Sequence, residues 1–148
     1  MSRVDVAHGA EHRLKQACQT VYKHFLAGRK VWVYSSDVKR LAAFSKGLWE
    51  VESTAFVPHS YLGQEGEKVS VYLCDTLPDE VLSQFVQAEG DTPWLLNLDL
   101  ACPPDYQRFK RILEIVSNHP EDKRLAKERI RTYKQHQQQV VYHDLGRN

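Results

Sequence analysis

Short runs of β-branched and aromatic residues alternate with longer amphipathic stretches along most of this chain. The short runs are typical of strands, and the longer stretches repeat apolar residues every three or four positions, which is typical of helices. Strands that alternate with helices favour a mostly parallel sheet with right-handed crossovers and helices on both faces. Since 148 residues are enough for one such unit, we predict a single α/β domain over residues 1–148.

The expected elements can be placed along the chain from the same patterns. Gly and Pro residues mark the ends of these elements. Residues 135–139 are polar and show no regular spacing of apolar residues. We therefore expect the tail at about 137–148 to be flexible. Strands are predicted at 3–7, 31–34, 69–74 and 94–98, an extended segment at 54–59, and helices at 14–26, 36–48, 79–89, 106–116 and 123–134.

Cysteine usage and the absence of long apolar runs predict where the protein resides. Cys18, Cys74 and Cys102 are odd in number, far apart and next to apolar runs, which favours reduced, buried thiols over a disulfide framework. The first residues lack the apolar core of a signal peptide, and no apolar run approaches the ~20 residues that a membrane span needs. We expect a cytoplasmic protein that is neither secreted nor inserted into a membrane.

The strongest charge feature lies at residues 123–134. This stretch holds six Lys or Arg residues and one acid, Glu128, whereas the net charge of the whole chain is only +1. It contains no Gly or Pro and is rich in helix formers, so it should form a helix with a basic face. A local patch of this kind predicts an acidic partner, although a charged face that is merely solvated remains the alternative.

A second cluster joins large apolar side chains to a proline. Trp49 ends an expected helix, and Phe56, Val57 and Pro58 follow on an extended segment. Because proline cannot donate a ladder hydrogen bond, this segment should lie at an edge of the sheet, where a protein partner could cover it. The alternative is that these side chains belong to the core of the domain itself.

One group of residues could support catalytic chemistry. Asp37, Asp75 and Asp99 all follow expected strands, and three carboxylates at the carboxyl edge of a sheet could hold a magnesium ion in a metal-dependent hydrolase. Caps and turns are the commoner role of Asp at such positions. No spaced glycines form a phosphate loop. His8 and His12 are four residues apart and could bind a transition metal, but near a strand-to-helix turn a solvated pair is the commoner interpretation. No cofactor and no metal are therefore expected.

Three segments in this order resemble one known family. They are Gly47-Leu48-Trp49, Phe56-Val57-Pro58-His59, and Leu125-Ala126-Lys127-Glu128-Arg129 followed by Tyr133. Together with the α/β layout they resemble the chi subunit of bacterial DNA polymerase III over nearly the full chain. The resemblance implies a Rossmann-like fold without nucleotide-binding loops and a clamp-loader accessory subunit with no catalytic site of its own.

The resemblance also implies two partners, each with its own surface, in a protein that is a monomer or a one-to-one heterodimer and meets DNA only indirectly. One partner is the acidic C-terminal tail of single-stranded DNA-binding protein, which ends in Asp residues followed by Ile-Pro-Phe and a free carboxylate. The other is the psi subunit or another clamp-loader component. The implied tail site comprises Val116, Lys123, Arg124, Lys127, Ile130, Arg131, Tyr133 and Lys134, and the implied psi site comprises Trp49, Phe56, Val57 and Pro58.

Two positions of the implied tail site depart from the family pattern. Lys127, which would pair with the terminal carboxylate, replaces an Arg and so lacks bidentate geometry, and Ile130 stands where an aromatic side chain is expected. A direct nucleic-acid-binding module is the main alternative, because a basic helix with Tyr133 could follow phosphates and stack a base. The metal-dependent hydrolase is the third.

Overall fold

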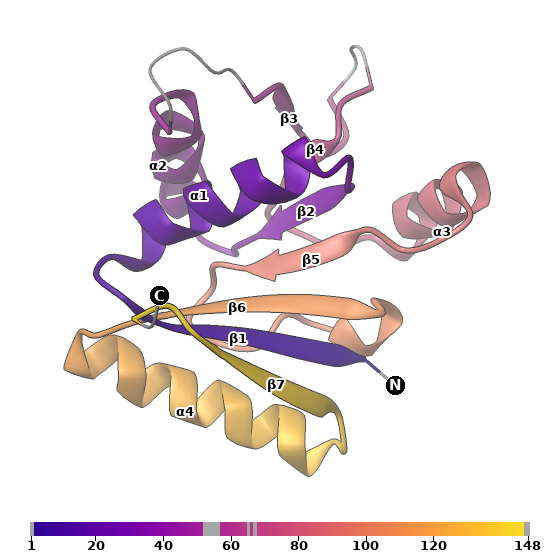
Figure 1. The fold of residues 1–148 in the computed structure, drawn as a ribbon. Coiled ribbons are helices and arrows are strands. Elements are labelled where there is room, and N and C mark those ends of the chain that lie inside the picture. The colour runs from indigo at the N-terminus through magenta and orange to yellow at the C-terminus, as the bar shows by residue number, and fades with distance from the viewer. Residues whose placement is uncertain (1, 52–56, 65, 67, 147–148) are drawn as a thin grey trace.

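The sheet is entirely parallel and has seven strands. A computed structural model describes residues 2–51, 57–64, 66 and 68–146, and orders the strands β3-β4-β2-β5-β6-β1-β7. This arrangement confirms the predicted α/β class with a parallel sheet, and it is consistent with a Rossmann-like fold (Figure 1). The strands are β1 (Arg3–Ala10), β2 (Val31–Tyr34), β3 (His59–Tyr61), β4 (Val71–Cys74), β5 (Trp94–Asn97), β6 (Arg111–Ser117) and β7 (Gln139–Asp144).

Among the described residues, four helices cover the two faces of this sheet in pairs. Helices α1 (Arg13–Leu26) and α2 (Val38–Trp49) bury their apolar stripes in one core cluster, together with one set of strand side chains. Leu82 of α3 (Asp79–Glu89) and Tyr133 of α4 (Pro120–Gln135) belong to a second cluster with the alternate strand residues. The helices therefore lie on both faces, as the sequence predicts.

Local sequence explains where several elements begin and end. The Asp37 side chain accepts a hydrogen bond from the Lys39 amide at 3.0 Å and caps α2. Helix α3 ends at Gly90, whose φ of 84° favours glycine. All four residues of β2 are buried, because β2 lies between β4 and β5 and is covered on both faces.

The helix predicted at 106–116 is wrong. Tyr106–Arg108 forms a single 3-10 turn, and Arg111–Ser117 is strand β6, which lies between β5 and β1. A strand that is covered on both faces needs apolar residues at nearly every position, and the run Ile112-Leu113 with Ile115-Val116 provides them. The same run places apolar residues at three- and four-residue spacing, which imitates a helix.

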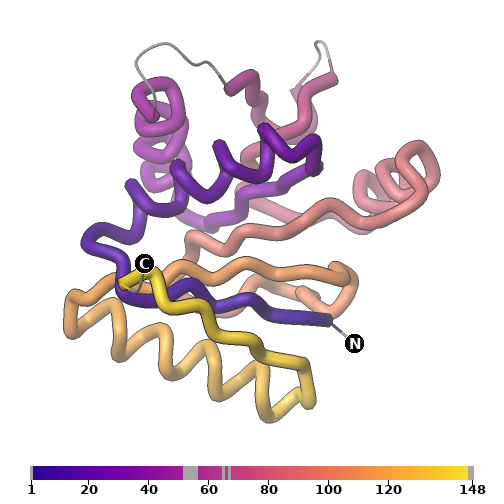
Figure 2. The backbone as a smooth tube through the Cα atoms, viewed as in Figure 1, coloured from indigo at the N-terminus to yellow at the C-terminus, as the bar shows by residue number. Residues whose placement is uncertain are grey.

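The flexible tail predicted at 137–148 is wrong for most of its length. Gln139–Asp144 forms strand β7, which pairs with β1 from Arg3↔Gln139 to His8↔Asp144. The first and last strands of the chain therefore lie side by side in the sheet (Figure 2). Strand β7 is also an edge strand, and its surface becomes part of the site described below.

Cys18 and Cys74 are buried and Cys102 is half-buried, and none of the three forms a disulfide. Burial raises the pKa of the Cys18 thiol to about 12 and that of Cys102 to about 11, so both are protonated at neutral pH. Within the described residues, no helix combines the length and the apolar character that crossing a membrane requires.

Candidate protein-binding groove

The basic stretch forms the predicted helix. Pro120 occupies its first turn together with Glu121 and Asp122, and these residues suit a helix N-terminus. The helix buries Ala126, Arg129 and Tyr133 against the sheet. The remaining cationic side chains of α4 are exposed, namely Lys123, Arg124, Lys127, Arg131 and Lys134.

A groove of about 870 Å³ runs between this helix and strands β1, β6 and β7, and we call it the α4 groove. Six of the eight residues predicted for the tail site line it, so the structure brings most of that site together. Its floor is apolar, formed in part by Val6 and Ala126. The lining residues are Val6, His8, Val116, Lys123, Ala126, Lys127, Ile130, Arg131, Lys134, Gln135 and Tyr142.

The charge of the α4 groove has one sign. Lys123, Lys127, Arg131 and Lys134 line it, and no Asp or Glu is among the described residues of its wall. Lys123, Lys127 and Arg131 are spaced four residues apart and so share one side of the helix. An apolar floor beneath uncompensated cations can bind a ligand that is both apolar and anionic.

Two residues predicted for the tail site do not line the groove. Arg124 lies on the exposed side of α4, where its guanidinium pairs with Glu121 at 2.5 Å and with Glu128 at 3.3 Å. The hydrogen bond from Arg124 lowers the pKa of Glu121. Tyr133 is completely buried, so it belongs to the core and not to the pocket wall.

Five residues that line the groove were not predicted from the sequence, namely Val6, His8, Ala126, Gln135 and Tyr142. Tyr142 on β7 is 49% exposed, and its ring centroid lies 5.4 Å from Lys134 Nζ and 6.4 Å from the ring of His8 on β1. The family pattern has an aromatic residue at position 130 of the helix, where this chain has Ile. In the structure the aromatic side chain enters the groove from β7 instead. The run Val140-Val141-Tyr142 is a strand signal that could have revealed this wall.

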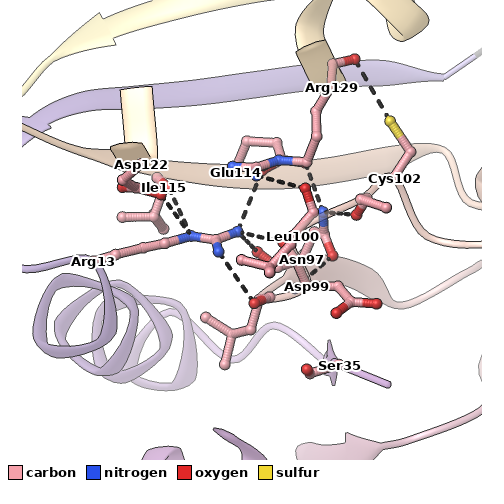
Figure 3. Close-up of polar contacts among 12 residues, drawn as sticks. Arg13, Ser35, Asn97, Asp99, Leu100, Cys102, Glu114, Ile115, Asp122 and Arg129 are labelled. Atoms are coloured by element: carbon pink, nitrogen blue, oxygen red, sulfur yellow. Dashed lines mark hydrogen bonds and ion pairs between the residues drawn. The ribbon is translucent and has the colours of Figure 1, made fainter. Parts of the chain in front are cut away.

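A buried polar cluster holds α4 against the sheet (Figure 3). Glu114 on β6 accepts hydrogen bonds from Arg129 Nε at 3.0 Å and from the Tyr133 hydroxyl at 2.6 Å, both on α4. It also accepts one from Asn97 Nδ2 at 2.8 Å on β5. Because every contact is buried, this cluster fixes which face of α4 points away from the sheet.

Arg13 at the start of α1 joins the same cluster from the other side. Its guanidinium donates to the carbonyl oxygens of Leu98 at 3.1 Å and Asp99 at 2.9 Å, and lies 3.8 Å from Glu114. Burial lowers the pKa of Arg13, and Glu114 opposes that shift. The guanidinium therefore occupies the carboxyl ends of β5 and β6, where doubly wound sheets commonly bind ligands.

The apolar cluster predicted for the second partner is divided by the structure. Trp49 ends α2 and is 56% exposed, and its ring lies 5.6 Å from that of His59. Pro58 is half-buried beside the edge strand β3, which agrees with the expected edge. Val57 is 1% exposed and belongs to the core, whereas Phe56 lies outside the described residues.

The three carboxylates considered for a hydrolase have other roles in the structure. Asp37 caps α2, and Asp99 accepts a hydrogen bond from Ser36 Oγ at 2.9 Å and pairs with Arg40 at 3.4 Å. Asp75 is exposed. Over the described part of the chain, no group of three or more His, Cys, Asp or Glu residues is arranged to hold a metal ion.

Comparison with known proteins shows to which family the chain belongs. Residues 1–141 match the family described as DNA polymerase III chi subunit, HolC. The chain is also 26% identical over 140 residues to the DNA polymerase III subunit chi of Pseudomonas aeruginosa, an alignment that covers 91% of this chain and 88% of that protein. Since the family match extends over almost the entire sequence, the chain belongs to the DNA polymerase III chi subunit family.

Proposed function

We propose that this chain is a non-catalytic accessory subunit of the replicative DNA polymerase, which bridges the clamp loader to the acidic C-terminal tail of single-stranded DNA-binding protein. Membership of the chi family supports the assignment to DNA polymerase III. The observation that carries the tail-binding proposal is the α4 groove, with four cations and an apolar floor.

The dimensions of the groove suit a short extended peptide. Lys123 and Lys134 are separated by about 16 Å along the helix, given a rise of 1.5 Å per residue. An extended peptide of about five residues spans that length at about 3.3 Å each. The acidic residues of a tail could therefore lie along the cations while its terminal apolar residues reach the floor.

Different parts of the groove should contribute differently to binding. Exposed charge pairs contribute about 0.2 to 1 kcal/mol each, whereas burying a Phe side chain contributes about 1.5 to 3 kcal/mol. The apolar end of the peptide, together with a carboxylate held by Lys127, should therefore decide affinity. The outer cations Lys123, Arg131 and Lys134 should mainly raise the association rate.

The second surface of the bridge is proposed around Trp49 and Pro58. A tryptophan that is 56% exposed at the end of α2, beside an edge strand, offers apolar area to a partner. We assign this surface to the psi subunit or another clamp-loader component. It lies on α2, which packs in the opposite core cluster from α4, so both partners could bind at once.

The tail assignment is tested by titrating the protein with a synthetic acidic peptide ending in Pro-Phe, as the free acid and as the C-terminal amide. We expect the amide to bind at least about tenfold more weakly, since it lacks the charge that Lys127 would pair. Lys127→Glu with Arg131→Glu should abolish binding of the free acid. Lys39→Glu with Lys46→Glu on α2 is the matched control for net charge and should bind normally.

The same α4 variants, tested for retention of single-stranded DNA, separate this function from nucleic-acid binding by α4. If the α4 groove bound the phosphates of nucleic acid, the protein would retain single-stranded DNA with no partner protein present. Reversing the charges of Lys127 and Arg131 would then remove that retention. If the α4 groove binds the tail instead, it would hold DNA only through single-stranded DNA-binding protein with an intact tail, and the same reversals would leave any direct retention of DNA unchanged. If the α4 charge reversals leave peptide affinity unchanged, the proposed tail site is wrong.

A further inference from the structure

A second groove lies on the opposite face of the same strands. It has a volume of about 530 Å³, and Arg3, Asp5 and Ala7 of β1 line it, whereas Val6 and His8 line the α4 groove. Alternate residues of a strand point to opposite faces, so the two grooves are separated by the thickness of the sheet. We call this second site the arginine groove, and its charged or aromatic lining residues are Arg3, Asp5, Lys23, His24, Arg29, Trp94, Arg111, Glu114 and His143.

Cations and one aromatic residue form a row across the amino ends of neighbouring strands. Arg3 begins β1 and is paired in register with Arg111, which begins β6. Trp94 begins β5, next along the sheet, and pairs with Val31, the first residue of β2. Arg29 precedes that strand by two residues, so the row extends over four adjacent strands that are about 4.8 Å apart.

The guanidinium groups in this row are held in place by their neighbours. Arg29 and Arg111 lie over the Trp94 ring, with their central carbons 4.7 Å and 4.4 Å from its centroid. Asp5 pairs with Arg3 at 3.0 Å and lies 3.7 Å from Arg111 Nε. Because these contacts limit side-chain motion before any ligand arrives, binding an anion there would cost little ordering entropy.

The arginine groove keeps an excess of positive charge after its own acids are counted. Arg3, Lys23, Arg29 and Arg111 line it together with two carboxylates, those of Asp5 and Glu114. Glu114 is 1% exposed and already forms an ion pair with Arg129, on the other side of the sheet. Burial, together with the nearby charges of Arg29, Lys23 and Arg111, lowers the pKa of His24 to about 4. This histidine is therefore neutral at pH 7, and the excess comes from Lys and Arg.

We propose that the arginine groove binds the sugar-phosphate backbone of single-stranded nucleic acid. Guanidinium forks match phosphate oxygens in bidentate geometry and stack on aromatic rings, whereas the cations of the α4 groove are mostly lysines. A linear row of cations with an interposed aromatic side chain is typical of sites that follow a flexible strand. Because a single strand is flexible, it can follow this row of cations in a groove of about 530 Å³ more closely than a stiff duplex can.

This site would give the protein a direct contact with DNA, in addition to the indirect one through single-stranded DNA-binding protein. The two grooves lie on opposite faces and share no lining residue. The protein could therefore bind a tail peptide and a DNA strand at the same time. The inference does not depend on the tail proposal, since each groove can fail its own test while the other passes.

The test is a fluorescence anisotropy titration of a labelled oligothymidylate with the full chain, in the absence of other proteins. Three phosphate contacts give a salt slope of about −2, so affinity should fall about 20-fold between about 50 and 200 mM salt. Arg29→Glu with Lys23→Glu should weaken binding at least about tenfold at about 50 mM salt. Lys23→Glu alone is a second variant, exposed at the end of α1, that keeps the contacts of Arg29 and should weaken binding about threefold.

The matched control is Lys127→Glu with Arg131→Glu, which makes the same change in net charge on the other face. It should bind the oligonucleotide within about twofold of the parent chain, while the arginine-groove variants should still bind the tail peptide normally. The proposal is overturned if the parent chain does not bind at the lower salt concentration, if both charge reversals weaken binding equally, or if oligoglutamate displaces the oligonucleotide at equal concentration. Duplex binding as tight as single-strand binding would also contradict it.

Discussion

Arg129 Nε donates a hydrogen bond to Glu114 Oε1 at 3.0 Å, and the two side chains are only 2% and 1% exposed. This pair joins α4 to the inner strand β6 beneath the α4 groove. A buried charge that loses its partner is strongly unfavourable, because neither water nor another ion replaces the contact. The pair therefore orients the helix whose other side carries the proposed binding cations.

Removing Arg129 should destabilise the fold strongly. Arg129→Ala removes the nearest cation from buried Glu114 and leaves only the more distant Arg13 guanidinium at 3.8 Å. We expect the free energy of unfolding to fall by about 3 to 5 kcal/mol. Urea unfolding followed by circular dichroism measures the loss. Arg124→Ala is the matched control on the same helix, because Arg124 also pairs with glutamates but in full solvent, and its effect should be far smaller.

Gly47 should not tolerate even a methyl group. A Cβ at this position would lie 2.8 Å from Cys18 Sγ, so α1 and α2 approach each other closely here. We expect Gly47→Ala to lower the free energy of unfolding by about 1 to 3 kcal/mol. In a double-mutant cycle, Cys18→Ala should recover part of that loss; strictly additive effects would show that the clash is not the cause.

Lys127→Arg should strengthen binding of the acidic peptide. The guanidinium can form two parallel hydrogen bonds with the terminal carboxylate, whereas the lysine ammonium acts as a single charge. We expect affinity to rise about threefold for the free-acid peptide and to remain unchanged for the amide. Isothermal titration of both peptides measures the difference, and equal gains for the two would argue against a carboxylate contact at this position.

His24 should make stability depend on pH. Its pKa is lowered from 6.5 to about 4 by burial and by Arg29, Lys23 and Arg111, so the folded chain favours the neutral ring. The stability that this neutrality contributes is fully present above pH 6.5 and is lost as the pH falls toward about 4, by on the order of 2 kcal/mol. Unfolding in urea at pH 7 and about 4.5 should show a smaller loss for His24→Gln than for the parent chain.

His12→Gln is the control for this pH dependence. His12 is exposed at the start of α1, so its replacement should leave the loss on acidification as large as in the parent chain. If His24→Gln and His12→Gln behave alike, His24 does not carry the effect. Any remaining pH dependence in both variants would come from other titrating groups.

Trp49→Ala should weaken binding of the psi subunit or other clamp-loader component. Exposed tryptophans at interfaces often contribute more than about 1 kcal/mol, so a loss of about tenfold in affinity is expected. Leu26→Ala, which changes another exposed apolar residue on the same face, is the control and should bind normally. Both variants should retain peptide binding in the α4 groove, and surface plasmon resonance with each partner measures this separation.

Several elements were predictable because their pattern depends only on near neighbours. Local burial imposes a regular spacing of apolar residues on each of these elements. Examples are the apolar stripe of α2, the β-branched run of β2 and the basic helix α4. The segment 106–116 was predicted wrongly for the same reason. A strand in the middle of a parallel sheet is apolar on both sides, and its run of apolar residues contains helical spacings by necessity.

The sequence by itself determined the α/β class and the position of the basic helix, because period, caps and charge are local properties. Only the tertiary structure decided which cations face a groove. Arg129 and Lys127 are two residues apart on one helix, yet one is buried against Glu114 and the other lines the α4 groove. That difference depends on which strand lies beneath the helix. Tyr142 and His8 come together in the α4 groove only because β7 pairs with β1.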